Sequence, residues 1–301
     1  MGSNNIGRIR GKGDKVFDTI NYTMLVLLAI ITLYPFWYIV VISLSTQAEA
    51  NKIGLHIFTA NPNLDSYRSI FKNSYIYSAY GNTILRTVLG TLVNLVLTTM
   101  LAYAMSKKYL PNRNFYTSIV VFTMFFSGGL IPSYLLIRSL KLINTIWALI
   151  IPGAISTYNM IIIRNYFQSL PLELEESAKI DGANDVRILI SIYLPVSTPV
   201  IATVALWCLV GHWNAWFDAL IYTNGNQNLM VLQLLLRKLL IEGSNNLINA
   251  SSLRIEDSSL APSTESIKAA TIMVATVPIL MVYPFIQKYF VKGIMIGSLK
   301  G

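Results

Sequence analysis

A charged segment between two long apolar runs carries residue types suited to docking rather than to catalysis. Residues 171–195 read PLELEESAKIDGANDVRILISIYLP. Pro171 suits the first position of a helix, and the glutamates that follow it are favoured near the positive end of the helix dipole. Glu175 and Lys179 have the i,i+4 spacing of a helical ion pair. This pattern predicts a short amphipathic helix at the start of the segment.

The middle of the same segment predicts a sharp turn. Asp181 can end the first helix and cap a second one, and Gly182 permits the backbone to turn between them. Apolar residues follow, and Pro195 and Pro199 make the next apolar run irregular. We therefore predict a bent pair of helices at the membrane surface, presented to a partner.

No catalytic constellation is evident along the chain. It contains no GxxxxGK[ST] phosphate-binding loop, so we expect no ATP site of that kind. Cys208 is the single cysteine, and a structural thiol is the default interpretation. His56 and His212 have no His or Cys cluster around them, so we predict no metal site and no bound cofactor.

Polar and aromatic side chains inside apolar runs are the remaining candidates, because such groups are costly in a bilayer and often face a pathway. His212 and Asp218 belong to one such cluster. Aromatic rings can stack on sugars, although Trp and Tyr near a span end more often serve interfacial anchoring or helix packing. The candidate pathway residues are Asn94, Tyr158, Asn159, Trp213, Asn214 and Trp216.

The composition indicates that the apolar runs holding these side chains are membrane-spanning helices. The chain of 301 residues is 54% hydrophobic and only 12% charged, about half the charge of an ordinary soluble domain. Apolar runs reach the length of about 20 residues that a spanning helix needs. We predict an all-α membrane protein with six transmembrane helices, near 17–44, 84–105, 115–137, 143–163, 188–210 and 269–290.

The distribution of Lys and Arg predicts the orientation. With both termini in the cytoplasm, 13 of the 23 basic residues lie inside, including those before the first span. This orientation places the charged segment in the cytoplasm. Among the outward basic residues, Arg86 is expected either to help form an electrostatic funnel for an anion or to anchor at lipid headgroups.

Two segments are expected outside. Residues 45–80 are predicted to form a small ordered cap. The external loop 222–268 contains an apolar run at 230–241 that is too short to span. We expect this run to lie in the interface or against a partner, followed by a mobile or contacting polar stretch.

The spacing of the charged segment resembles a known motif. Glu176-Ser177-Ala178, Asp181-Gly182-Ala183 and Leu194-Pro195 are similar to the EAA loop of ABC importer permeases, with Ser replacing the middle Ala. The resemblance extends to 144–152, to Trp213-Asn214 and to the ending 287–301, as in carbohydrate importers. The run 123–132, TMFFSGGLIP, resembles the branch that imports acidic oligosaccharides from pectin or alginate.

The resemblance implies a type I ABC importer permease fold and a division into residues 1–80 and a permease domain at 81–301, with its coupling loop at 165–190. It implies a second homologous permease, two cytoplasmic ATPase subunits that bind ATP and Mg, an extracellular solute-binding protein and an oligosaccharide substrate, in a bacterial inner membrane and without nucleic acid. The coupling residues would be Glu175, Glu176, Ser177, Ala178, Asp181, Gly182 and Ala183.

Two other classes are weighed against this interpretation. An ion-coupled secondary carrier would need paired intramembrane acids or inverted repeats, and neither is evident. A membrane-embedded enzyme would need clustered catalytic groups at depth, whereas the acids lie almost entirely in loops. Dependence of transport on a separate ATPase that binds residues 171–187 would exclude both.

Overall fold

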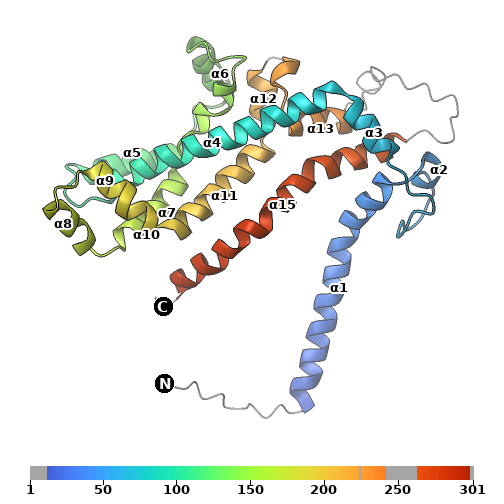
Figure 1. Cartoon of the computed structure of the whole chain (residues 1–301), viewed down its shortest axis with the longest axis horizontal. Coiled ribbons are helices and arrows are strands. Elements are labelled where there is room, and N and C mark those ends of the chain that lie inside the picture. Colours follow the sequence, from blue (N-terminus) through green and yellow to red (C-terminus); the bar gives the residue numbers. More distant parts are fainter. Residues whose placement is uncertain (1–11, 224, 242–262, 299–301) are drawn as a thin grey trace. The chain divides into compact units, whose positions relative to one another are not determined.

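A computed structural model describes residues 12–223, 225–241 and 263–298, and every regular element in these ranges is a helix (Figure 1). The predicted all-α architecture is confirmed. The basic residues Arg8 and Arg10, the polar stretch at 242–262 and residues 299–301 lie outside the described residues. The chain divides into two compact units, Met1–Ile70 with Leu253–Met273, and Phe71–Ser252 with Val274–Gly301.

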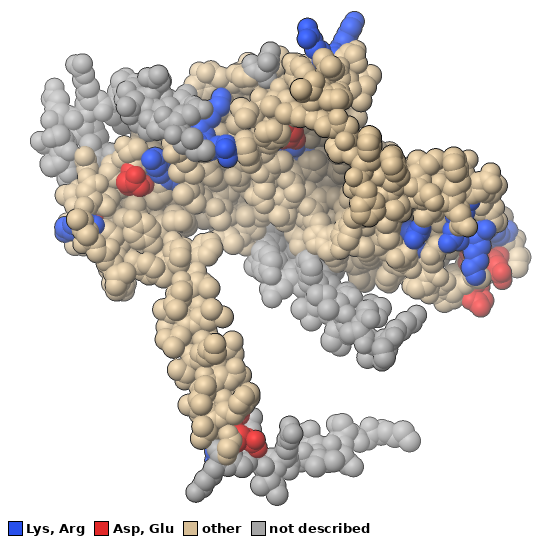
Figure 2. All heavy atoms as spheres, turned by 180° about the vertical axis from the view of Figure 1, so that it is seen from behind, with Lys and Arg blue, Asp and Glu red and all other residues tan. Residues whose placement is uncertain are grey.

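The first unit begins with a long helix, α1 (Lys12–Ser43), that is apolar along its length and charged near its start (Figure 2). The short α2 (Gln47–Ala50) follows, and α3 (Asp65–Lys72) begins at the end of this unit. The buried carboxylate of Glu49 accepts hydrogen bonds from Thr59 and Asn61 and so holds the loop between α2 and α3. Trp37 donates to the Ile57 carbonyl at 2.8 Å, which ties that loop to α1.

The second unit is built around α4 (Ser74–Ser106), along which α7 and α11 lie (Figure 1). Its apolar core contains Tyr103, Phe167, Ile188 and Tyr193. The remaining helices are α5 (Arg113–Phe125), α6 (Leu130–Ser139), η1 (Ile146–Leu149), η2 (Ile151–Gly153), α7 (Thr157–Gln168), α8 (Glu173–Ile180), α9 (Asp185–Ile188), η3 (Leu189–Tyr193), α10 (Leu194–Val196), α11 (Thr198–Asn214), α12 (Phe217–Tyr222), η4 (Gln227–Leu229), α13 (Leu232–Ile241) and α15 (Thr264–Ser298), whose first turns belong to the other unit.

The six predicted apolar runs correspond to continuous helices and to broken ones. Three described helices, α1, α4 and α15, are long and apolar enough to cross a membrane, and the number reaches six if each of three bent pairs forms one span. The pairs bend by 113° between α5 and α6, by 52° before α7 and by 88° before α11. Gly129, with φ of 88°, is the capping residue before α6 and lies at the break between α5 and α6.

The apolar run at 230–241 forms α13 and packs within the second unit, where Leu232 and Leu235 are fully buried. The Leu232 backbone N–H donates to the Thr83 hydroxyl of α4 at 2.8 Å. This run therefore packs against α4.

Candidate functional site

The charged loop, residues 169–188, ends its first helix with a complete hydrogen-bonded cap. In α8 the Gly182 N–H donates to the Lys179 carbonyl at 3.0 Å, and the Ala183 N–H donates to the Ala178 carbonyl at 2.9 Å. This pair of bonds is a Schellman motif, which needs a residue in the left-handed region. Gly182 supplies it with φ of 77°. The predicted turn and its glycine are confirmed.

Two local details differ from the prediction. Asp181 ends α8, but Asn184 caps α9, because its side chain accepts from the Arg187 N–H at 2.9 Å. Pro171 lies before the capping residue Leu172 rather than in the first helical position. The turn is therefore longer than the sequence suggested, and it leaves the Asp181 side chain exposed.

The two faces of α8 differ sharply in exposure. Glu175 and Ala178 are buried, whereas Glu176 and Ser177 face solvent. Two apolar side chains near the turn are also exposed, Ile180 at 86% and Val186 at 64%. Exposed apolar groups flanked by charges are typical of surfaces that bind another protein.

The buried Glu175 is the centre of a polar network. Its carboxylate accepts from Lys107 at 2.5 Å, from Lys179 at 2.7 Å and from the Tyr193 hydroxyl at 2.9 Å. The predicted pair with Lys179 is thus present. Burial by itself raises the pKa of Glu175, but these hydrogen bonds outweigh burial and lower the pKa to about 2. The carboxylate is therefore charged at neutral pH.

A cavity of about 490 Å³ opens beside this network. Lys108 and Arg113 line it together with residues of the network. Figure 2 shows charged side chains at the right-hand end, at the top and toward the left, whereas the broad surface between them carries almost none. Charge near the ends with an uncharged surface between them is the distribution expected of membrane-spanning helices.

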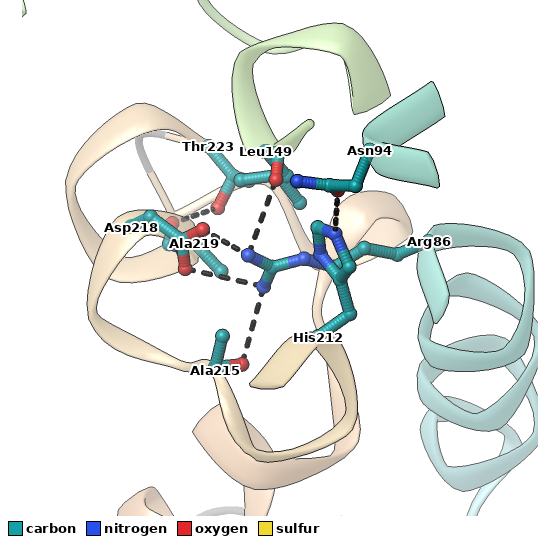
Figure 3. A network of polar contacts seen from close by, with 8 residues as sticks. All are labelled: Arg86, Asn94, Leu149, His212, Ala215, Asp218, Ala219 and Thr223. Atoms are coloured by element: carbon teal, nitrogen blue, oxygen red, sulfur yellow. Dashed lines mark hydrogen bonds and ion pairs between the residues drawn. The ribbon is translucent and has the colours of Figure 1, made fainter. Parts of the chain in front are cut away.

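A second polar site lies inside the helical body, around Arg86 of α4 (Figure 3). Its guanidinium forms a two-pronged ion pair with Asp218 of α12, one prong measuring 3.1 Å. It also donates to the carbonyls of Leu149 and Ala215, each at 3.2 Å. The residue is only 2% exposed. Arg86 therefore neither forms an open funnel nor anchors at lipid headgroups, contrary to both expectations.

Asn94 forms a second cross-link two turns further along α4. Its amide donates to the Gly153 carbonyl at 2.7 Å, and its oxygen lies 2.8 Å from the His212 ring nitrogen. Gly90 lies between Arg86 and Asn94 on α4, and an added Cβ there would be 2.5 Å from the His212 ring. The glycine thus allows α4 and α11 to approach closely.

These two cross-links supply hydrogen bonds to backbone carbonyls that the broken helices leave unpaired. Leu149 ends η1, Gly153 ends η2 and Ala215 follows α11, so their carbonyls lack donors from a continuing helix. Unpaired carbonyls are costly at membrane depth unless side chains supply the hydrogen bonds. Arg86 and Asn94 supply them and thereby fix the interrupted segments to α4.

The candidate pathway residues fall into two groups. A cavity of about 300 Å³ is lined by Asn94 and Asn159 together with Arg86, His212 and Asp218. Beside it, the exposed Tyr158 ring lies 5.9 Å from that of Trp207, which lines the cavity.

The other candidates have packing or bridging contacts. Trp213 is buried and donates to the Ala275 carbonyl of α15 at 3.2 Å. Asn214 accepts a long hydrogen bond of 3.5 Å from Gln233, and the Trp216 ring lies under the guanidinium of Arg237 at 3.9 Å. None of these three lines the polar cavity.

Sequence reasoning missed the roles of Lys107, Tyr193 and Arg86. Lys107 is separated from its partner Glu175 by 68 residues, so no local pattern connects them. For Arg86 and Asp218 a signal existed, because each is a lone charge among apolar residues. Charges in that setting usually face one another inside a helical bundle.

Apolar helices, broken spans fixed by buried polar groups and an exposed charged helical turn define a helical membrane protein of the transport class. Residues 76–296 match the family model described as binding-protein-dependent transport system inner membrane component. The chain belongs to this family, the permease subunits of ABC importers, and is an integral inner-membrane protein. The resemblance inferred from the charged loop is thereby confirmed.

Similar proteins cover nearly the whole chain. It is 44% identical to Protein LplC of Bacillus subtilis over 96% of this chain and 97% of the relative. It is 41% identical to the polygalacturonan/rhamnogalacturonan transport system permease protein YtcP of the same organism, over 96% and 99%. A chain of a crystallised bacterial ABC transporter involved in the import of the acidic polysaccharide alginate matches with a TM-score of 0.87, at 31% identity over 94% of this chain and 99% of that one.

Proposed function

We propose that this permease imports oligosaccharides, specifically acidic ones built from uronates such as pectin or alginate fragments. Polygalacturonan and alginate are both polymers of sugar acids, and they occur in the names of the relative at 41% identity and of the matching structure. Full-length similarity to both is the observation that carries the proposal.

The proposed assembly contains a second homologous permease, two ATPase subunits that bind ATP and Mg, and an extracellular solute-binding protein. A crystal structure of a bacterial alginate ABC transporter with a pentasaccharide-bound periplasmic protein resembles this chain in fold, with a TM-score of 0.59 at 18% identity. This chain would bind no cofactor and hydrolyse no ATP itself, so the energy for transport would come from the ATPase subunits.

The charged loop is the proposed docking surface for an ATPase. Both termini and this loop would face the cytoplasm, as the distribution of basic residues predicts. Glu176, Ser177, Asp181 and the exposed Ile180 offer charged and apolar contacts around a turn that Gly182 fixes. Closure of the ATPases would displace this turn and bias the permease between inward-facing and outward-facing states.

The polar cavity around Asn94 and Asn159 is the proposed part of the sugar pathway in this subunit. Its amide and imidazole groups can exchange hydrogen bonds with sugar hydroxyls, and Trp207 presents a ring to a pyranose. Asp218 neutralises Arg86 in this conformation. The cavity therefore offers hydrogen bonds rather than a free cation to its ligand.

Reconstitution of the complete complex in liposomes tests the proposal. We expect the solute-binding protein loaded with oligogalacturonate or oligoalginate to stimulate ATP hydrolysis and uptake. Stimulation by neutral oligosaccharides alone would refute only the acidic substrate class. Uptake that needs an ion gradient and no ATPase would instead favour a secondary carrier.

Docking is tested separately in the same complex. Glu176→Lys reverses a charge on the exposed face of α8, and we expect it to release the ATPase subunits from the membrane. Lys108→Glu reverses an exposed charge outside α8 and serves as the control. Retention of the ATPases by the Glu176 variant would contradict the docking assignment.

A further inference from the structure

A single carboxylate, that of Glu175, connects three elements of the second unit. It belongs to α8, it accepts from Lys107 at the end of α4, and it accepts from Tyr193 in the π-helical turn η3. The two distances are 2.5 Å and 2.9 Å. The helix proposed to receive the ATPase is thus bonded directly to two membrane-entering segments.

The lysine of this junction is enclosed on its other sides. The Lys107 ammonium lies 3.8 Å from the centre of the Tyr103 ring and 4.2 Å from that of Tyr193. These two rings meet edge to face at 5.0 Å. Phe167 of α7 packs against both rings, at 6.4 Å and 5.3 Å. Aromatic faces and a carboxylate therefore hold the ammonium in one place.

The other buried residue of α8, Ala178, also contacts the helical body. Ala178 packs into the core that contains Phe167 and Ile188. Apart from Glu175 and Ala178, the residues of α8 are exposed. A displacement of α8 therefore reaches the helical body through these two residues and through the backbone at each end.

The π-helical turn places the tyrosine of the junction. A π turn contains one residue more than an α turn of the same height and shifts the side chains that follow. In η3 this turn spans Leu189–Tyr193 and ends on the tyrosine that reaches Glu175. Pro195 and the 88° bend follow at once. The network thus anchors the segment directly before this bend.

We propose that Glu175 is a positioning residue that couples the movement of α8 to α4 and to the bent span behind η3. This inference rests on the proposed function, in which an ATPase moves α8. A buried ion pair that is also hydrogen-bonded resists separation strongly, so α8 and the ends of both spans move together. Docking itself uses the opposite, exposed face of α8.

Glu175→Gln in the complete complex, reconstituted in nanodiscs, tests the inference. This variant keeps the size of the side chain and removes its charge. We expect the ATPase subunits to stay bound and basal hydrolysis to persist, while stimulation by the loaded solute-binding protein falls at least tenfold. Asp14→Asn changes an exposed carboxylate of α1, outside the proposed docking face, and should stay within twofold of the wild type.

A double variant separates coupling from folding. Lys107→Met alone should also lower stimulation at least tenfold. Combining it with Glu175→Gln removes both buried charges, so we expect the melting temperature to recover while stimulation stays low. Recovery of stimulation together with the melting temperature would overturn the inference, because the pair would then serve stability alone.

Two further outcomes have clear meanings. Loss of the ATPase subunits from the Glu175→Gln complex would overturn the inference, since Glu175 would then belong to docking. Stimulation within twofold of the wild type would overturn it as well. A wild-type complex that never responds to the loaded solute-binding protein would refute the proposed function itself, and the inference with it.

Discussion

Lys107 Nζ lies 2.5 Å from Glu175 Oε2, and the two side chains are 6% and 7% exposed. The pair joins the end of α4 to α8 across 68 residues of sequence. Both charges have lost most of their water, so each depends on the other for compensation.

Removing the lysine should therefore be costly. Lys107→Met leaves the Glu175 carboxylate buried with only Lys179 and Tyr193 as donors, and we expect a loss of about 3 kcal/mol in the free energy of unfolding. Thermal unfolding of the detergent-solubilised chain measures it. Lys108→Met changes an exposed neighbour and should shift the melting temperature little; equal shifts would show that the buried pair adds no stability.

The charged loop should lose stability at acid pH. The pKa of Glu175 is lowered from 4.5 to about 2 in the folded chain, so its contribution is complete above pH 4.5 and is lost as the pH falls toward 2. Hydrogen exchange of α8 between pH 5 and pH 3 measures this loss. In Glu175→Gln the same interval should bring a smaller change, and an unchanged pH profile would contradict the assignment.

Two glycines of α4 should respond differently to the same substitution. Gly90→Ala places a methyl group 2.5 Å from the His212 ring, which Asn94 holds at 2.8 Å. We expect a loss of about 1 to 3 kcal/mol from overpacking. Gly81→Ala meets nothing within 4 Å and should be neutral or stabilising. Equal melting temperatures for the two variants would show that α4 and α11 separate easily.

The Arg86 site should require a guanidinium, because this group can donate hydrogen bonds to several acceptors at once. Arg86→Lys keeps the charge but cannot donate to Asp218, Leu149 and Ala215 together, so we expect about 2 kcal/mol of destabilisation and lower uptake. Arg138→Lys is the control because Arg138 is exposed. Full stability and uptake in Arg86→Lys would mean that a point charge is sufficient at this position.

A substitution of Gly182 in the turn after α8 should be tolerated only if the new residue adopts the left-handed backbone conformation at low energetic cost. Gly182 has φ of 77°, which Asn adopts far more readily than Val. We expect Gly182→Asn to retain ATPase subunits in a membrane pull-down and Gly182→Val to lose most of them. Equal retention by both variants would show that the geometry of this turn does not govern docking.

The local features of the charged loop followed from the sequence. The acidic first turn of α8, the end of that helix at Asp181 and the need for Gly182 depend on neighbours within a few residues. The apolar runs likewise predicted every region that forms a long helix or a bent pair, because hydrocarbon thickness sets their length. The capping of α9 by Asn184 was missed, since Asp and Asn serve almost equally as caps.

The sequence by itself therefore determined the membrane class, the helical regions and the turn after α8, all of which depend on local composition and spacing. Only the tertiary structure decided which distant groups meet. Lys107 with Glu175, Arg86 with Asp218 and Asn94 with His212 are brought together by packing around α4. A buried charge requires a partner, but its sequence position does not say which one, because helix packing fixes that choice.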